Sequence, residues 1–202
     1  MSIVVEHEKR RREILKKALD VFMEEGFEDV TFQKIADRCG ITRTTLYIYF
    51  KNKRDIFNYS LKQFLQILES DIVGIGKKSN LSYSERLIDV MIIIIERLEE
   101  NNRLLSVILN YLVYASKGDY DPNYRVRRRT VRLRHIQTNM LIAGIKAGEF
   151  SPSINVKDAN ELLYSFIEAA IFRLVVLCRP SVGELKDAIE LAVRSLAVDK
   201  QE

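Results

Sequence analysis

Apolar side chains recur at the spacing of an α-helix in one segment of the chain after another. Ile14, Ala18 and Phe22, for example, follow one another at intervals of four residues, which places them on one helical face. Only three prolines and eight glycines interrupt 202 residues, so long helices are favoured over many short strands. The pattern predicts an all-α protein.

Helix-starting and helix-stopping residues divide the chain. Gly26 and Gly40 are typical stops, and Thr31 and Thr42 are typical N-caps. Asn52 with Asp55 opens a fourth helix that is expected to run to about residue 73. Later helices are expected from Ser82 or Ser84 to Leu98 and over 103–116, 123–147, 157–178 and 182–197, the last with a capping box of Ser181 and Glu184.

Composition excludes several classes of protein. Cys39 and Cys178 show no paired spacing, so we expect no disulfide framework and a reducing, cytoplasmic location. The apolar run at residues 90–95 is far shorter than a membrane span, and the N-terminus lacks the pattern of a signal peptide, so no membrane partner is expected. His7 and His135 are the two histidines, and no phosphate loop, nucleophile elbow or metal spacing appears. We therefore expect no catalytic residue, cofactor or metal.

The most informative stretch of the sequence is residues 31–50. It predicts two short helices joined by a turn at Gly40, which is the arrangement of a DNA-binding helix-turn-helix. Ile35, Ala36 and Leu46 are suited to the inside of this module. The opposite surface is expected to carry side chains that suit base edges and phosphates, namely Arg43, Thr44, Thr45, Tyr47 and Tyr49.

Residues 10–60 resemble the N-terminal part of the TetR family of prokaryotic transcriptional regulators. The residues that carry the resemblance are Ile14, Ala18, Phe22, Gly26, Phe27, Thr31, Ile35, Ala36, Gly40, Ile41, Leu46, Tyr47, Tyr49, Phe50, Lys53 and Ile56. Beyond residue 60 the likeness is architectural: the chain length, the number of helices, and a Gly148-Glu-Phe150 turn before the last two helices.

The resemblance implies a role for each residue of the module. Arg43, Thr44 and Thr45 are expected to face bases. Thr31, Thr42, Tyr47, Tyr49 and Lys53 are expected to hold the DNA backbone. Thr44 departs from the family because many members have glycine there, which puts in question how deeply the helix enters the groove.

Positive charge is unevenly distributed although the net charge is only +4. Residues 38–54 contain five basic residues and no acid, a pattern that attracts phosphates. Lys9 to Arg12 form a basic run that is either an arm reaching DNA or a solvated start of the first helix. The 1–60 region as a whole is nearly balanced, which speaks against a non-specific architectural DNA binder.

The segment 157–178 is apolar on almost every side, so it must be buried all round. In a chain of this length we expect the partner surface to be a second copy, as the family resemblance also implies. A two-fold dimer predicts a palindromic operator with half-sites roughly 34–36 Å apart or a multiple of this distance. The expected interface lies on the last two helices: Leu162, Phe166, Ala170, Leu174, Leu185, Ile189, Ala192 and Leu196.

The helices between 82 and 178 are expected to enclose a pocket for an unknown small-molecule effector. Candidate lining residues are Met91, Tyr111, Tyr114, Arg128, Arg132, Met140, Phe166 and Phe172, and core packing is an alternative role for the apolar ones. The cluster Arg125–Arg134 favours an anionic effector, a solvated face, or intersubunit ion pairs with Glu161, Glu168 or Glu184. The family implies that the fourth helix transmits a shift between two dimer conformations.

Taken together, these features predict a helix-turn-helix DNA-binding domain at 1–55 and a helical ligand-binding and dimerisation domain at 56–202. The expected function is a sequence-specific, ligand-responsive repressor that binds double-stranded DNA as a homodimer. The alternatives are an architectural DNA-binding protein and an activator of the same fold.

Overall fold

A computed structural model of the chain describes residues 3–76, 80–115 and 123–198, with side chains omitted at residues 3, 4, 114, 115, 123–130 and 132. Within these ranges the protein is all-α, which confirms the predicted fold class. The β-structure of the described residues is an isolated bridge between Phe150 and Ala197. No helix in the described part is long and apolar enough to cross a bilayer.

The chain divides into two compact units. The first comprises residues 1–66 and 103–122, and the second comprises 67–102 and 123–202. Helix α4 (Lys53–Gly76) contributes residues to both units. The division therefore differs from the functional boundary predicted at residues 55 and 56, because α6 (Asn102–Ala115) belongs almost entirely to the first unit. The predicted boundary itself stays a prediction about function.

The first unit is built on α1 (Ile3–Asp29), which bends at Gly26, where φ is 78°. With ψ at 159° this is not the left-handed helical backbone expected of a glycine stop, but it is a conformation that essentially only glycine adopts. Four aromatic rings form the centre of the unit, with Phe27 against Tyr111 at 4.5 Å and Phe57 against Tyr111 at 4.4 Å between ring centroids. Edge-on and tilted ring pairs of this kind contribute more to the stability of the fold than the burial of their surface alone. The cluster, completed by Phe22, thus ties α1, α4 and α6 together.

Two short helices, α2 (Phe32–Cys39) and α3 (Arg43–Tyr49), complete this unit. Thr31 caps α2 by accepting from the Lys34 amide at 3.2 Å, and Thr42 caps α3 by accepting from the Thr45 amide at 3.1 Å. Gly40 ends α2 with φ 68°, and its N–H donates to the carbonyls of Ala36 and Asp37. The predicted caps and stop are confirmed.

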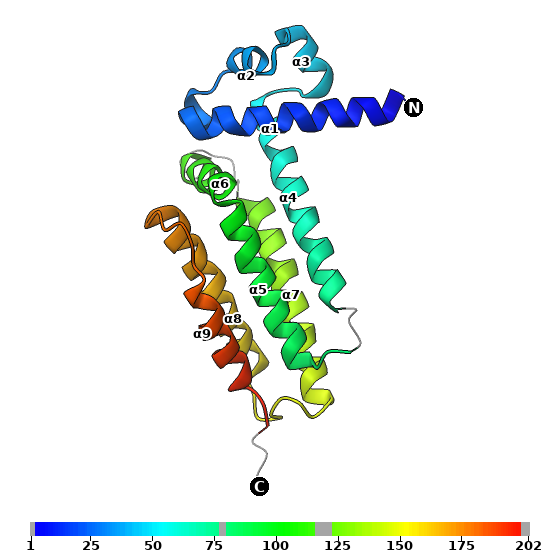
Figure 1. The fold of residues 1–202 in the computed structure, drawn as a ribbon, viewed down its shortest axis with the longest axis vertical. Coiled ribbons are helices and arrows are strands. Elements are labelled where there is room, and N and C mark those ends of the chain that lie inside the picture. Colours follow the sequence, from blue (N-terminus) through cyan, green and yellow to red (C-terminus); the bar gives the residue numbers. More distant parts are fainter. Residues whose placement is uncertain (1–2, 77–79, 116–122, 199–202) are drawn as a thin grey trace. The chain divides into compact units, whose positions relative to one another are not determined.

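The second unit is a bundle in which α5 (Tyr83–Glu100), α7 (Asn123–Lys146), α8 (Val156–Ile171) and α9 (Glu184–Arg194) pack side by side (Figure 1). A turn of π-helix, η1 (Phe172–Val176), extends α8. Ser82 and Glu85 form the capping box of α5, in agreement with the first of the two predicted starts.

The predicted capping box of α9 is wrong. The helix begins at Glu184 and has Gly183 as a cap without a side-chain hydrogen bond. The Ser181 hydroxyl instead donates to the Glu99 carboxylate at 3.0 Å, and Glu184 accepts from Arg173 and Arg179, each at 3.0 Å. Tertiary contacts of both residues therefore replace the local pairing that the sequence spacing suggests.

Substitution of two glycines in long helices tests how closely Phe150 packs against α7. Phe150 is fully buried and its ring covers Gly144 of α7, so that a methyl group on Gly144 would overlap the ring and lie 3.2 Å from the Tyr83 Cβ. Gly74 of α4 has no such neighbour within 4 Å. We expect Gly144→Ala to destabilise the protein by about 1–3 kcal/mol through overpacking. Gly74→Ala should stabilise it by about 0.5–1 kcal/mol.

The two variants should be compared by urea unfolding at one protein concentration. Equal midpoints for Gly144→Ala and the parent would contradict the close approach of Phe150 to α7.

Candidate nucleic-acid interface and ligand pocket

Helix α3 is held by its inner face and presents its outer face to solvent. Leu46 is completely buried and Phe50, which caps the helix, is 2% exposed. On the outer face Arg43 and Thr44 are exposed, and Tyr47 and Ile48 expose 49% and 67% of their surface. An isoleucine this exposed on a seven-residue helix is unusual for a residue type that is normally buried. Ile48 was missed from sequence, although its spacing of four from Thr44 places both on one face.

The exposed side chain of Tyr47 limits the positions that the Arg43 side chain can take on this surface. The Arg43 guanidinium donates to the Tyr47 hydroxyl at 3.2 Å and lies 5.7 Å from the centre of its ring. The Tyr47 ring in turn packs on Phe32 of α2, with 4.8 Å between centroids. Because each side chain limits the rotamers of the next, the guanidinium is held on the outer face of α3.

Three threonines lie at the helix starts and take part in hydrogen bonds within the module. Thr31 and Thr42 accept the capping hydrogen bonds described above, and the hydroxyls of Thr42 and Thr45 lie 2.8 Å apart. Thr31 and Thr42 are exposed, while Thr45 is half-buried. A hydroxyl has one donor and two acceptor sites, so a cap that accepts from an amide can still donate to a phosphate.

Tyr49, on the same helix, is half-buried and its ring stacks on His7 of α1, with 4.7 Å between centroids and 26° between planes. The two residues are far apart in sequence and no spacing signals their contact. The start of α1 therefore lies directly against a predicted DNA-contacting side chain.

Lys53 has a structural role that the sequence does not reveal. Its ammonium group donates to the carbonyls of Phe27, Glu28 and Val30 at 2.8, 2.6 and 2.8 Å, so its three donors satisfy the end of α1. Burial lowers its pKa, an effect that Glu28 and Asp29 oppose. In this structure Lys53 is a helix cap, and its phosphate contact stays a prediction.

The basic run at residues 9–12 lies inside α1, so the arm interpretation does not describe this structure. Arg10 pairs with Glu13 at 2.9 Å. Arg11 lies over the ring of Tyr59, with 3.9 Å to its centroid, and also over Phe50 at 5.0 Å. Arg10 and Arg11 therefore contact other residues of the first unit.

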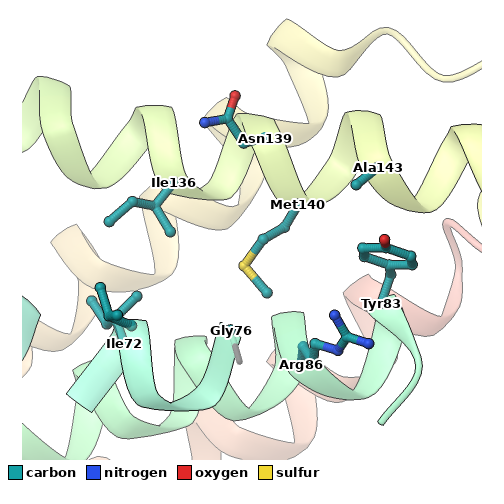
Figure 2. Close-up of a pocket in the computed structure, with 9 residues that line it drawn as sticks. Ile72, Gly76, Tyr83, Arg86, Ile136, Asn139, Met140 and Ala143 are labelled. Carbon is teal, nitrogen blue, oxygen red and sulfur yellow. The ribbon is translucent and has the colours of Figure 1, made fainter. Parts of the chain in front are cut away.

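A pocket of about 330 Å³ lies in the second unit between the end of α4, the start of α5 and the second half of α7 (Figure 2). Met140 points from α7 into the space, with Ile72 and Ile136 at one end and Tyr83 and Arg86 at the other. The remaining lining residues are Val73, Gly76, Asn139 and Ala143. In the described part of the chain no group of three or more His, Cys, Asp or Glu side chains is arranged to hold a metal ion.

Of the predicted pocket residues, Met140 lines this space and four others do not. Met91 is fully buried under Gln137, whose amide lies 2.9 Å from its sulfur. Tyr111 belongs to the aromatic centre of the first unit, and Phe172 is 52% exposed. Phe166 is half-buried and is not part of the lining. The side chains of Tyr114, Arg128 and Arg132 lie outside the described residues, as do those of Arg125, Arg127 and Arg129.

Burial also redefines the candidate dimer surface. Ala170, Leu174, Leu185 and Ile189 expose 4% or less, because α8, η1 and α9 use them to pack within one chain. Leu162 is 45% exposed, and Phe166, Ala192 and Leu196 are half-buried. The largest apolar exposure on these elements belongs to residues outside the predicted set: Phe172 at 52%, Val176 at 58% and Leu191 at 73%.

Comparison with known proteins agrees with this geometry. Residues 14–59, which contain α2 and α3, match the family model described as bacterial regulatory proteins, tetR family. The HTH-type transcriptional repressor KstR2 of Mycobacterium tuberculosis is 29% identical over 175 residues, which cover 85% of this chain and 82% of the relative. The fatty acid metabolism regulator protein of Bacillus subtilis is 25% identical over 167 residues, covering 79% and 80%.

Solved structures share the fold along nearly the whole chain. The structure of ketosteroid transcriptional regulator KstR2 of Mycobacterium tuberculosis superimposes with a TM-score of 0.70 at 22% identity, covering 94% of this chain and 96% of that one. A TetR transcription regulator from Haloarcula marismortui gives a TM-score of 0.77 at 20% identity, covering 94% and 97%. The helix-turn-helix match, the relatives and the fold agree: residues 14–59 of this chain match the tetR family of bacterial regulatory proteins, and the chain as a whole is similar to regulators that share its fold.

Proposed function

We propose that the protein is a ligand-responsive transcriptional repressor that binds a palindromic DNA operator as a homodimer. The observation that carries the proposal is the outer face of α3, where Arg43, Thr44, Tyr47 and Ile48 are exposed together on a helix that its caps and core hold in place. A short helix that presents such side chains matches the recognition helix of a helix-turn-helix.

Each exposed side chain has a base-edge partner that suits it. Arg43 offers the fork of donors that guanine accepts in the major groove. Thr44 and Ile48 offer aliphatic groups, which contact the methyl group of thymine. Thr45 is proposed to face bases as well, and Thr31, Thr42, Tyr47 and Tyr49 to hold the sugar-phosphate backbone.

The proposed dimer surface is the apolar exposure of α8, η1 and α9. Leu162 belongs to α8 and Leu191 to α9. These two helices are neighbours in the bundle (Figure 1). We propose that these exposed apolar side chains form one interaction surface, because large exposed apolar patches mark such surfaces. A two-fold interface would use the same patch on both copies and would present two α3 helices to the DNA.

The pocket of the second unit is the proposed effector site. Residues of α4 line it, and the same helix begins in the first unit, where Lys53 caps α1. A ligand that binds better to one conformation of the dimer would shift the population toward it. The names of the two relatives, a transcriptional repressor and a fatty acid metabolism regulator protein, support a repressor that regulates metabolism.

Selection of bound sequences from random duplex DNA by the purified protein tests the proposal as a whole. Enrichment of an inverted repeat, with affinity that falls steeply as salt rises, is the expected result. Salt-sensitive binding without an enriched sequence would contradict the proposed repressor and favour an architectural DNA-binding protein.

Arg43→Ala should weaken binding to the selected operator about tenfold to a hundredfold, because a bidentate arginine contact discriminates by about 1–3 kcal/mol. Binding is measured by fluorescence anisotropy at fixed salt. Lys146→Ala, which removes an exposed cation from α7 away from the proposed DNA and dimer surfaces, is the control and should leave affinity unchanged. An equal loss in both variants would mean that general charge, not placement on α3, determines binding.

Leu191→Glu should convert a dimer into a monomer, because it places a charge on a side chain that is 73% exposed and proposed to be buried between copies. Sedimentation velocity distinguishes the two states. Ile67→Glu, at a 56% exposed apolar residue of α4, should leave the dimer intact. A Leu191→Glu protein that still sediments as a dimer would place the interface elsewhere.

A further inference from the structure

The pocket of the second unit combines apolar walls with one arginine. Ile72, Ile136, Met140 and Ala143 supply aliphatic surface, and no carboxylate is among the described residues that line the space. We propose that this pocket binds an amphipathic anion, a carboxylate with an unbranched apolar tail, and that Arg86 holds the carboxylate. The inference rests on the proposed effector role of the pocket and names the chemistry of its ligand.

Arg86 is already held in position without a ligand. Its Nε donates to the Leu81 carbonyl at 2.9 Å, and its guanidinium lies over the Tyr83 ring, 4.8 Å from the centroid. Within the described part of the chain neither an ion pair nor a hydrogen bond engages its two terminal nitrogens. A planar fork with these donors unused matches the two oxygens of a carboxylate.

The acidic residues next to Arg86 are engaged elsewhere. Glu85 accepts from the Ser82 amide at 2.8 Å in the capping box of α5. Glu149 accepts from the Ser84 amide at 3.1 Å. Glu85 and Glu149 thus bind backbone amides, and neither forms an ion pair with Arg86.

The opposite end of the pocket suits a hydrocarbon. Ile72 and Ile136 lie there, and Met140 points between the two ends (Figure 2). Methionine is unbranched and flexible, so it adapts to chains of different length. A volume of about 330 Å³ lies at the small end of the range for ligand pockets, which favours a medium-length tail.

Charge and shape together select among ligand classes. A cationic amphiphile would place two positive charges together, and a neutral alcohol would leave the guanidinium fork without an anion. Hydrogen bonds to charged groups contribute about twice as much as neutral ones. The pocket should therefore prefer a carboxylate over an alcohol of the same chain length.

The test is calorimetric titration of the full-length protein, without DNA, with n-decanoate, n-decanol and decyltrimethylammonium below their micellar concentrations. The parent should bind decanoate at least about tenfold more tightly than decanol. Arg86→Gln should remove that preference and leave decanol binding in place. Lys146→Gln, which removes an exposed cation from α7 outside the pocket, should keep the preference.

Ala143→Leu provides a second variant that fills the pocket and should abolish binding of both decanoate and decanol. Thermal unfolding of each variant shows whether the fold is retained. Absence of decanoate binding to the parent, equal affinity for decanoate and decanol, or a preference for the ammonium compound would overturn the proposal. An unchanged preference in a folded Arg86→Gln protein would do the same.

Operator release is measured separately, by adding decanoate to the protein bound to its selected operator. Decanoate that binds through Arg86 without releasing DNA would leave the ligand assignment standing and contradict the proposed effector control. A protein that selects no operator would contradict the proposed function, while the titrations without DNA would still decide the ligand class.

Discussion

The proposed reading of DNA depends on a helix that cannot be stable by itself. Helix α3 has seven residues, far below the length at which an isolated helix persists in water. It is held by Leu46 and Phe50 on its inner face, by the Thr42 cap, and by α2, whose end is fixed by the left-handed Gly40. Because the inner face is committed to packing, the outer face is free to carry Arg43 and Ile48.

Packing and ion pairs in the rest of the first unit hold the elements that carry this short helix. The aromatic centre joins α1, α4 and α6, and the Lys53 ammonium closes the end of α1 with three hydrogen bonds. Ion pairs of Lys34 with Glu25 and of Arg38 with Glu24 connect α2 to α1. The two cations of α2 are thus paired with acids of the first unit, whereas the described residues offer Arg43 of α3 the Tyr47 hydroxyl and no acidic partner.

Local signals predicted most of the fold, and tertiary contacts account for what they missed. Caps, stops and periodicity located the helices of the first unit because Thr31, Gly40 and Thr42 act within a few residues of themselves. Ser181 and Glu184 have the spacing of a capping box, yet contacts with Glu99 and Arg173 decide their roles. The lining of the pocket described above comes from three segments, and most of it was not predicted because apolar periodicity does not distinguish a cavity wall from a core. For the same reason periodicity does not separate Leu185, which is buried within one chain, from Leu191, which is exposed.

Hydrogen exchange of the purified protein tests the central claim most directly, namely that the outer face of α3 contacts DNA. The measurement compares the protein alone, with its selected operator, and with a scrambled duplex of the same length and composition. The account predicts that the operator slows amide exchange at residues 42–50 and that the scrambled duplex does so far less. Protection confined to other segments, with exchange at 42–50 unchanged, would contradict it.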